Sequence, residues 1–173
     1  MEDILDICKY ILPSVVVFVT AFYLLKTFLQ ADHKKRLVEI RMGNNKVITP
    51  LRLQAYERVV LLLERISPES IISRSNISGS TASQLQLQLI SAIRTEFEHN
   101  LSQQVYMSDS AWEMVKNAKE ETIKMINLSM SKLSDSAQGM DLCKILLEMT
   151  TKMEKLPTVN ALEYVKREVR QNF

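Results

Sequence analysis

The chain has 173 residues, and its 22 basic and 20 acidic side chains leave a formal net charge of only +2. From residue 53 onward, fourteen basic and fifteen acidic residues nearly cancel, which argues against a nucleic-acid-binding surface. The two cysteines and two histidines lack the spacing of a zinc site, so we expect no metal and no cofactor.

Residues Tyr10 to Leu29 form a long apolar stretch near the start of the chain. The sixteen residues between Lys9 and Lys26 carry no formal charge. As a helix they would extend about 24 Å, slightly less than the ~30 Å hydrocarbon core of a bilayer. The two flanking lysines can close this gap by extending their ammonium groups outward. We therefore predict a single transmembrane helix within residues 1–30. A cleaved signal peptide is disfavoured, because the leader is acidic and the apolar run is too long.

A basic collar at residues 31–48 follows this stretch. Over residues 32–52, six basic side chains stand against two acidic ones, whereas the residues before the span are mostly acidic. Basic residues are retained on the cytoplasmic side of a membrane, so we expect a periplasmic N-terminus and a cytoplasmic remainder. The collar is also expected to contact anionic lipid. Its main cations are Lys34, Lys35, Arg36 and Arg41.

The remaining residues, 49–173, have the periodicity of amphipathic helices and predict an all-α cytoplasmic bundle. We expect the membrane helix to stop at Gly43-Asn44-Asn45 and a new helix to begin at Thr49-Pro50, where threonine caps and proline occupies the first turn. Ser67-Pro68-Glu69 repeats this chemistry for a short helix. Thr81-x-x-Gln84 is a capping box, which predicts another helix start.

The segment LQLQL at 85–89 alternates as a strand would, but its apolar positions also fit one face of a helix, and we favour the helix. Further helices are expected to begin at Ser108, after the turn at 134–139, and at Thr158. The apolar face of the helix after the capping box comprises Ala82, Leu85, Leu89, Ala92, Ile93, Phe97 and Leu101. The inward residues of the last helix are expected to be Val159, Leu162, Val165 and Val169.

Three blocks carry a resemblance to a known family: LRLQAYERVVLLLERISPES, IRTEFEHNLSQQVYMSDSAWEMVKNAKEE and ALEYVKREVRQNF. They resemble the sequence blocks of a family of uncharacterised membrane-anchored proteins from Bacteroidota, and the likeness covers nearly the whole chain. It implies a bacterial inner-membrane protein. It implies no activity and no catalytic residues.

The densest group of ionisable and polar residues comprises Glu96, Glu98, His99 and Asn100, here called the polar cluster. Glu96-x-x-His99 has the spacing of a di-iron ligand pair, but such a site needs a second Glu-x-x-His, and the only other histidine lies in the collar. We therefore expect a structural role, either as a polar network between helices or as a solvated face.

Two further expectations concern the partners of these side chains. Arg94 or Lys116 could pair with the carboxylates of the polar cluster across helices. Trp112 could be an exposed anchor for a partner protein, although a tryptophan near a helix start more often belongs to the core.

No Ser-His-Asp order, glycine-rich phosphate loop or Cys-His pair is present, so we do not expect an enzyme. The favoured function is a membrane-anchored adaptor or accessory subunit, which assembles with itself or with a larger inner-membrane complex. The alternative is a small regulatory domain that binds a lipid or another ligand within its helical bundle.

Overall fold

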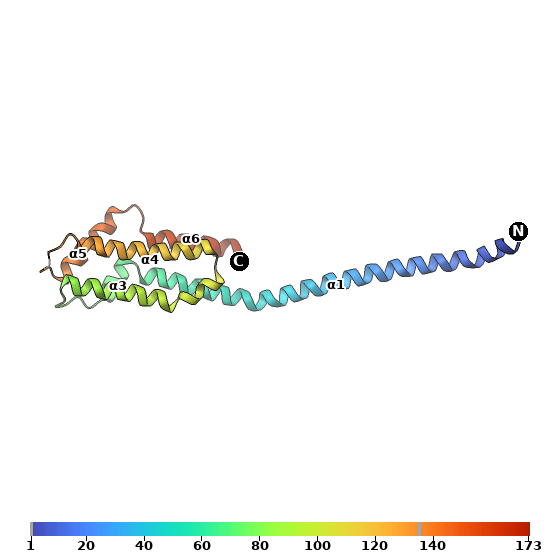
Figure 1. Cartoon of the computed structure of the whole chain (residues 1–173), viewed down its shortest axis with the longest axis horizontal. Helices are drawn as coiled ribbons and strands as arrows, with labels where there is room; N and C mark the ends of the chain where they lie inside the picture. The colour runs from blue at the N-terminus through green and yellow to red at the C-terminus, as the bar shows by residue number, and fades with distance from the viewer. Residues whose placement is uncertain (1, 135) are drawn as a thin grey trace. The chain divides into compact units, whose positions relative to one another are not determined.

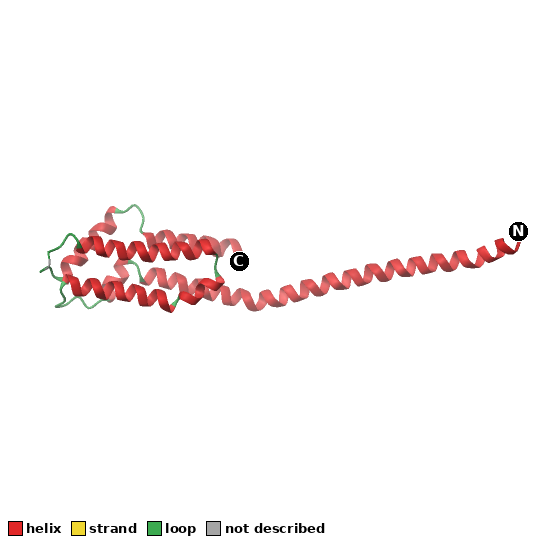
Figure 2. Ribbon diagram, in the orientation of Figure 1, coloured by secondary structure: helices red, strands yellow, loops and turns green. Residues whose placement is uncertain are grey.

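The computed structural model is all-α, as the sequence predicts (Figure 1). It describes the backbone of every residue except Met1 and Asp135, and the side chains of residues 15–30, 32, 35, 46–134 and 136–173. Figure 2 shows helices joined by loops, with no strand in the described part of the chain. The chain divides into two units, Met1–Thr49 and Pro50–Phe173.

The first unit is helical from its second residue onward and forms the N-terminal part of α1, Glu2–Arg65. Every residue from 15 to 30 is exposed, and large apolar side chains such as Phe18 and Phe28 leave 71% and 72% of their surface uncovered. Among the residues whose side chains are described, no helix combines the length and the apolar character needed to cross a membrane. Residues 10–14 of the predicted span lie outside the described side chains.

The predicted helix stop at Gly43-Asn44-Asn45 and the new start at Thr49-Pro50 were wrong, because the backbone is helical through all five residues. Glycine and asparagine only weaken a helix, by no more than about 1 kcal/mol per residue, so they signal an end without enforcing one. Pro50 removes one backbone hydrogen bond. The boundary between the two units falls at this proline.

The second unit is a helical bundle built around α4 (Figure 1). The C-terminal part of α1 is followed by α2 (Pro68–Arg74), α3 (Ala82–His99), the 3₁₀ helix η1 (Leu101–Tyr106), α4 (Asp109–Met130), α5 (Gly139–Lys152) and α6 (Pro157–Asn172). Helix α4 packs against α3, α5 and α6. The largest fully buried apolar side chains come from α1, α2, α3, α4, α5 and the residue that follows α1: Leu62, Leu63, Ile66, Ile71, Leu85, Leu89, Ile93, Ile126, Leu142 and Leu146.

Three of the predicted helix starts are confirmed by their capping hydrogen bonds. The Ser67 hydroxyl accepts from the backbone N–H of Ser70 at 3.4 Å. In the capping box, the backbone N–H groups of Thr81 and Gln84 each donate to the other residue's side chain, at 3.1 and 3.2 Å. The hydroxyl of Ser108 accepts from Ala111 at 3.1 Å. These caps satisfy backbone donors that the first turn of a helix leaves without an intrahelical partner.

Two helix ends differ from the prediction. Helix α3 stops at His99 and the chain tightens into η1, which leaves Leu101 45% exposed instead of buried. Helix α6 begins at Pro157, and its buried face includes Thr158 rather than Val159, which is 36% exposed. Of the other residues expected to face inward, Val165 is buried and Leu162 and Val169 are partly buried against the core, whereas Ala161 and Glu168 complete the buried face.

The starts of α3 and α5 are tied together at one end of the bundle. The N–H of Ala82 donates to the carbonyl of Ala137 at 2.9 Å, and the N–H of Gly139 donates to the carbonyl of Ser80 at 2.9 Å. A Cβ atom at position 139 would lie 2.6 Å from the hydroxyl of Ser80. A side chain at this position would displace the Ser80 hydroxyl and crowd the Ser80 carbonyl, at 3.2 Å, so the close approach of the two loops favours glycine.

Candidate polar site on helix α3

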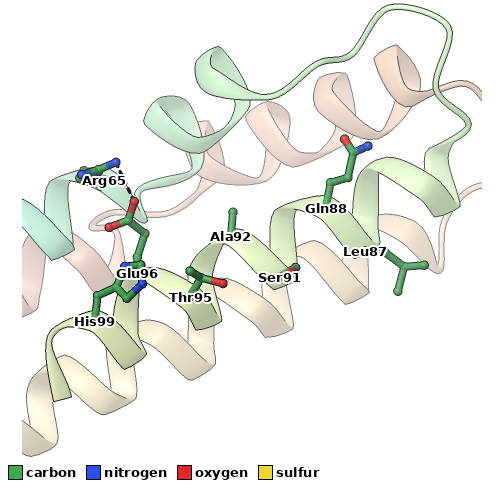
Figure 3. A pocket seen from close by; sticks show the side chains of 8 residues that line it. All are labelled: Arg65, Leu87, Gln88, Ser91, Ala92, Thr95, Glu96 and His99. Carbon is green, nitrogen blue, oxygen red and sulfur yellow. Dashed lines mark ion pairs between the residues drawn. The ribbon is translucent and has the colours of Figure 1, made fainter.

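A surface hollow of about 670 Å³ runs along α3 and is here called the α3 groove (Figure 3). Arg65 closes one end of it from α1, and every other lining residue belongs to α3. Those lining residues are Leu87, Gln88, Ser91, Ala92, Thr95, Glu96 and His99. The structure therefore places two members of the polar cluster, Glu96 and His99, in one groove.

Glu96 is the electrostatic centre of the groove. Its carboxylate lies 2.8 Å from a guanidinium nitrogen of Arg65 and 3.5 Å from one of Arg74, while only 16% of its side chain is exposed. Figure 3 shows the ion pair between Arg65 and Glu96. The expected partners Arg94 and Lys116 were wrong, because α1 and α2 approach Glu96 instead and Lys116 pairs with Glu113.

The other members of the polar cluster occupy different environments. The side-chain amide of Asn100 donates to the backbone carbonyl of Glu96 at 2.8 Å and so helps to end α3. His99 is exposed and lies between the α3 groove and a second hollow of about 260 Å³. Glu98 is exposed and lines neither hollow.

The chemistry of this site is that of a structural ion-pair network. The Glu96 carboxylate is held by two guanidinium groups, so its negative charge is already compensated. Among the residues with described side chains, no group of three or more His, Cys, Asp or Glu is arranged to hold a metal ion. The network links α1, α2 and α3 on the surface of the bundle.

Replacing Glu96 with glutamine is expected to lower the free energy of unfolding by about 1 kcal/mol or less, because partly exposed ion pairs contribute modestly. The loss arises from two guanidinium groups that then face each other without a carboxylate between them. Chemical denaturation checks this, with Glu98→Gln as the matched control on the exposed side of α3. Equal losses in both variants would contradict the structural role of Glu96.

Trp112 lies in the core and is only 6% exposed. Its ring stacks on Phe97 with 5.3 Å between ring centroids, and the ammonium group of Lys119 lies 4.4 Å from the centroid of Phe97 on α3. The side chain therefore packs α4 against α3. Trp112 therefore belongs to the core and is not an exposed anchor for a partner protein.

A second polar group lies inside the bundle, where α1, the start of α4 and α6 meet; it is here called the Glu168 network. The hydroxyl of Tyr56 donates to one carboxylate oxygen of Glu168. The same oxygen accepts from the backbone N–H of Ser108 at 3.1 Å, and the other accepts from the Ser108 hydroxyl at 2.5 Å. The Ser108 hydroxyl is also the N-cap of α4, so one carboxylate connects three helices.

These contacts shift two pKa values in opposite directions. Burial by itself would raise the pKa of Glu168, but the hydrogen bonds from Ser108 and Tyr56, with Arg52 nearby, hold it below its ordinary value. Burial, together with the hydrogen bond to Glu168, raises the pKa of Tyr56 to about 12. The stable state is thus a carboxylate that accepts from a neutral phenol.

Further contacts close this end of the bundle around Phe173. The guanidinium of Arg52 lies 5.3 Å from the centroid of the Phe173 ring, and its Nε donates to the carbonyl of Tyr106 at 3.1 Å. The rings of Tyr56 and Phe173 meet edge to face at 6.1 Å. The end of α6 is therefore held against α1 by both aromatic and cationic contacts.

The sequence interpretation missed the Glu168 network. Its only signal was that Glu168 follows Ala161 and Val165 by seven and three residues, a spacing that shares one helix face. The face proposed from valine and leucine positions alone did not include it. An acidic residue in a buried register indicates a partner on another helix.

The structure describes only some of the side chains of the basic collar. Lys35 is exposed, whereas the side chains of Lys34, Arg36 and Arg41 lie outside the described residues. Contact of the collar with lipid stays a prediction.

The chain matches a protein-family model over residues 2–172. No curated protein and no solved structure matches the chain. The family match covers both units and nearly every residue, in agreement with the extent of the sequence resemblance. The chain therefore belongs to the Family of unknown function (DUF7935).

Proposed function

We propose that the protein is a non-enzymatic adaptor or accessory subunit, anchored in a membrane by the N-terminal part of α1. The observation that carries this proposal is the uncovered apolar surface of the first unit. From Val15 to Leu29, valine, phenylalanine and leucine side chains are at least half exposed on all sides of the helix. Apolar surface of this extent is favourable only when lipid or other apolar side chains cover it.

The polar atoms within this stretch fit such an environment. The hydroxyl of Thr20 donates to the carbonyl of Val16 at 2.7 Å, and the hydroxyl of Thr27 donates to the carbonyls of Tyr23 and Leu24 at 3.0 and 2.9 Å. A helix that satisfies its own side-chain donors costs little to transfer into hydrocarbon. Together with the uncharged run from Tyr10 to Leu25 in the sequence, this supports an anchor rather than a packed soluble helix.

The basic collar supports an orientation with the N-terminus outside and the bundle on the cytoplasmic side. The resemblance described above supports a bacterial inner membrane. Near the surface, each collar lysine or arginine would add about 1 kcal/mol of attraction to anionic lipid. The anchor would keep the bundle at the membrane, where it can bind other membrane-associated chains.

The reactive side chains of the bundle support a binding role rather than catalysis. Glu96 is occupied by two arginines, and Glu168 is occupied by Tyr56 and Ser108. Cys143 is buried at 4% exposure, and burial raises the pKa of its thiol, which disfavours the nucleophilic thiolate.

Affinity purification of a C-terminally tagged full-length chain from its own host, in mild detergent, tests the adaptor role. We expect an assembly larger than one chain in its micelle, with stoichiometric copies of itself or of another membrane protein. Mass spectrometry identifies the components, and light scattering after gel filtration gives the protein mass. A monodisperse monomer without an enriched protein would contradict this function and favour ligand binding in the α3 groove.

A further inference from the structure

A third hollow lies between α1 and α6 and is here called the α1–α6 groove. It has a volume of about 500 Å³, and apolar side chains make up most of its surface. Two of these are well exposed, Leu53 at 40% and Leu61 at 60%. The lining residues are Leu53, Tyr56, Glu57, Val60, Leu61, Lys166, Val169 and Arg170.

The charges on the two sides of this groove are opposite in sign. Helix α1 contributes Glu57, and helix α6 contributes Lys166 and Arg170. Elsewhere on the bundle many charges are paired, such as Lys116 with Glu113. Within the described part of the chain, the three groove charges have no hydrogen bond or ion pair. They are therefore free to pair with charges outside the chain.

This pattern is complementary to itself. In a two-fold symmetric contact, α1 of one chain can lie along α6 of a second chain, and the reverse pairing occurs at the same time. Glu57 of each copy then faces Lys166 and Arg170 of the other. An α1-to-α1 contact would instead oppose two copies of Glu57.

We propose that the α1–α6 groove is a self-association surface, occupied by the same groove of a second copy in a two-fold arrangement in which α1 of each copy lies along α6 of the other. The exposed leucines supply the apolar contact, and the rim charges select the orientation. This inference rests on the proposed assembly role and deepens it by identifying the partner and the surface.

Charge reversal tests the arrangement in full-length protein purified in detergent. One chain carries Glu57→Lys and the other carries Lys166→Glu with Arg170→Glu, each with a different affinity tag. Each variant alone places like charges across the contact, so we expect self-association to weaken at least about tenfold. When the two variants are co-expressed, every acidic side chain again faces a basic one. We expect them to co-purify as strongly as two differently tagged wild-type chains.

Matched controls carry the same charge changes on exposed positions of other elements: Glu148→Lys on α5 for the first chain, and Lys132→Glu with Lys152→Glu for the second. These should self-associate like the wild type, and thermal unfolding confirms that all variants are folded. Undiminished self-association of Glu57→Lys would overturn the proposal, and so would failure of the mixed pair to co-purify. Membrane fractionation of the same variants reports the anchor independently, because none of the substitutions lies in residues 1–30.

Discussion

Lysines at Val19 and Phe22 are expected to release the full-length protein from membranes into the soluble fraction. Both positions lie near the middle of the Tyr10–Leu29 stretch, and both side chains are exposed, at 56% and 60%. A lysine at the centre of a membrane helix costs about 2.5–3.5 kcal/mol, so two cost about 5–7 kcal/mol. That is enough to reverse a preference for the bilayer of a thousandfold or more.

Sedimentation of membranes, with and without alkaline carbonate, followed by detection of a C-terminal tag measures this effect. The control chain carries Val19→Leu and Phe22→Leu, which keep the helix apolar, and it should stay in the membrane pellet with the wild type. Recovery of wild-type protein in the soluble fraction would contradict the anchor. Retention of the lysine variant in the carbonate-washed pellet would contradict it as well.

Replacing Glu168 with alanine is expected to give a loss of about 1–3 kcal/mol in the free energy of unfolding. The change removes an acceptor of three hydrogen bonds and leaves the buried Tyr56 hydroxyl without its partner, whereas the exposed Ser108 can bond to water instead. Each buried unsatisfied group costs about 1–3 kcal/mol. Urea denaturation followed by Trp112 fluorescence measures the loss, because this side chain is buried between α3 and α4.

The matched control on the same helix is Glu163→Ala, which removes an exposed ion pair with Lys155 and should cost less than about 1 kcal/mol.

The pH dependence of stability distinguishes the Glu168 network from a general packing effect. The folded-state pKa of Glu168 lies below its ordinary value of 4.5. The contribution of Glu168 to the free energy of unfolding is therefore complete above about pH 4.5. The contribution is lost as the pH falls through the lower, folded-state pKa.

Tyr56 determines the alkaline side of the dependence of stability on pH. Its folded-state pKa of about 12 lies above the ordinary value of 10.0. Its contribution is therefore complete below pH 10 and is lost as the pH rises through about 12. Glu168→Gln should flatten the acid limb, and Tyr56→Phe should flatten the alkaline limb. Unchanged pH profiles in both variants would contradict the network.

The all-α class and several helix starts could be predicted from the sequence, because they depend on residues close together in the chain. Ser67, Thr81 and Ser108 cap their own first turns, and each cap needs only residues two to three positions ahead in the chain. The apolar period of α3 was strong enough to overrule the strand-like alternation at 85–89, and residues 82–99 are helical. Local chemistry of this kind does not depend on the rest of the fold.

The ends of helices are harder to predict from the sequence, because the residues that favour an end change the free energy only slightly. Gly43-Asn44-Asn45 disfavours a helix by only about 1 kcal/mol per residue or less, and the helix continues through it. Helix α6 starts one residue before its predicted position, and its buried face includes Glu168, whereas Val159 is 36% exposed. The period of valines and leucines alone did not carry that information.

Which charged side chains meet depends on how the helices pack in three dimensions. Arg65 and Arg74 lie 31 and 22 residues before Glu96 in the chain, and Tyr56 lies 112 residues before Glu168. Such pairs form where helices cross, and the crossing is set by the packing of many apolar side chains rather than by either partner. The sequence therefore determined where the apolar and polar surfaces lie along each helix, and the fold decided which of them face one another.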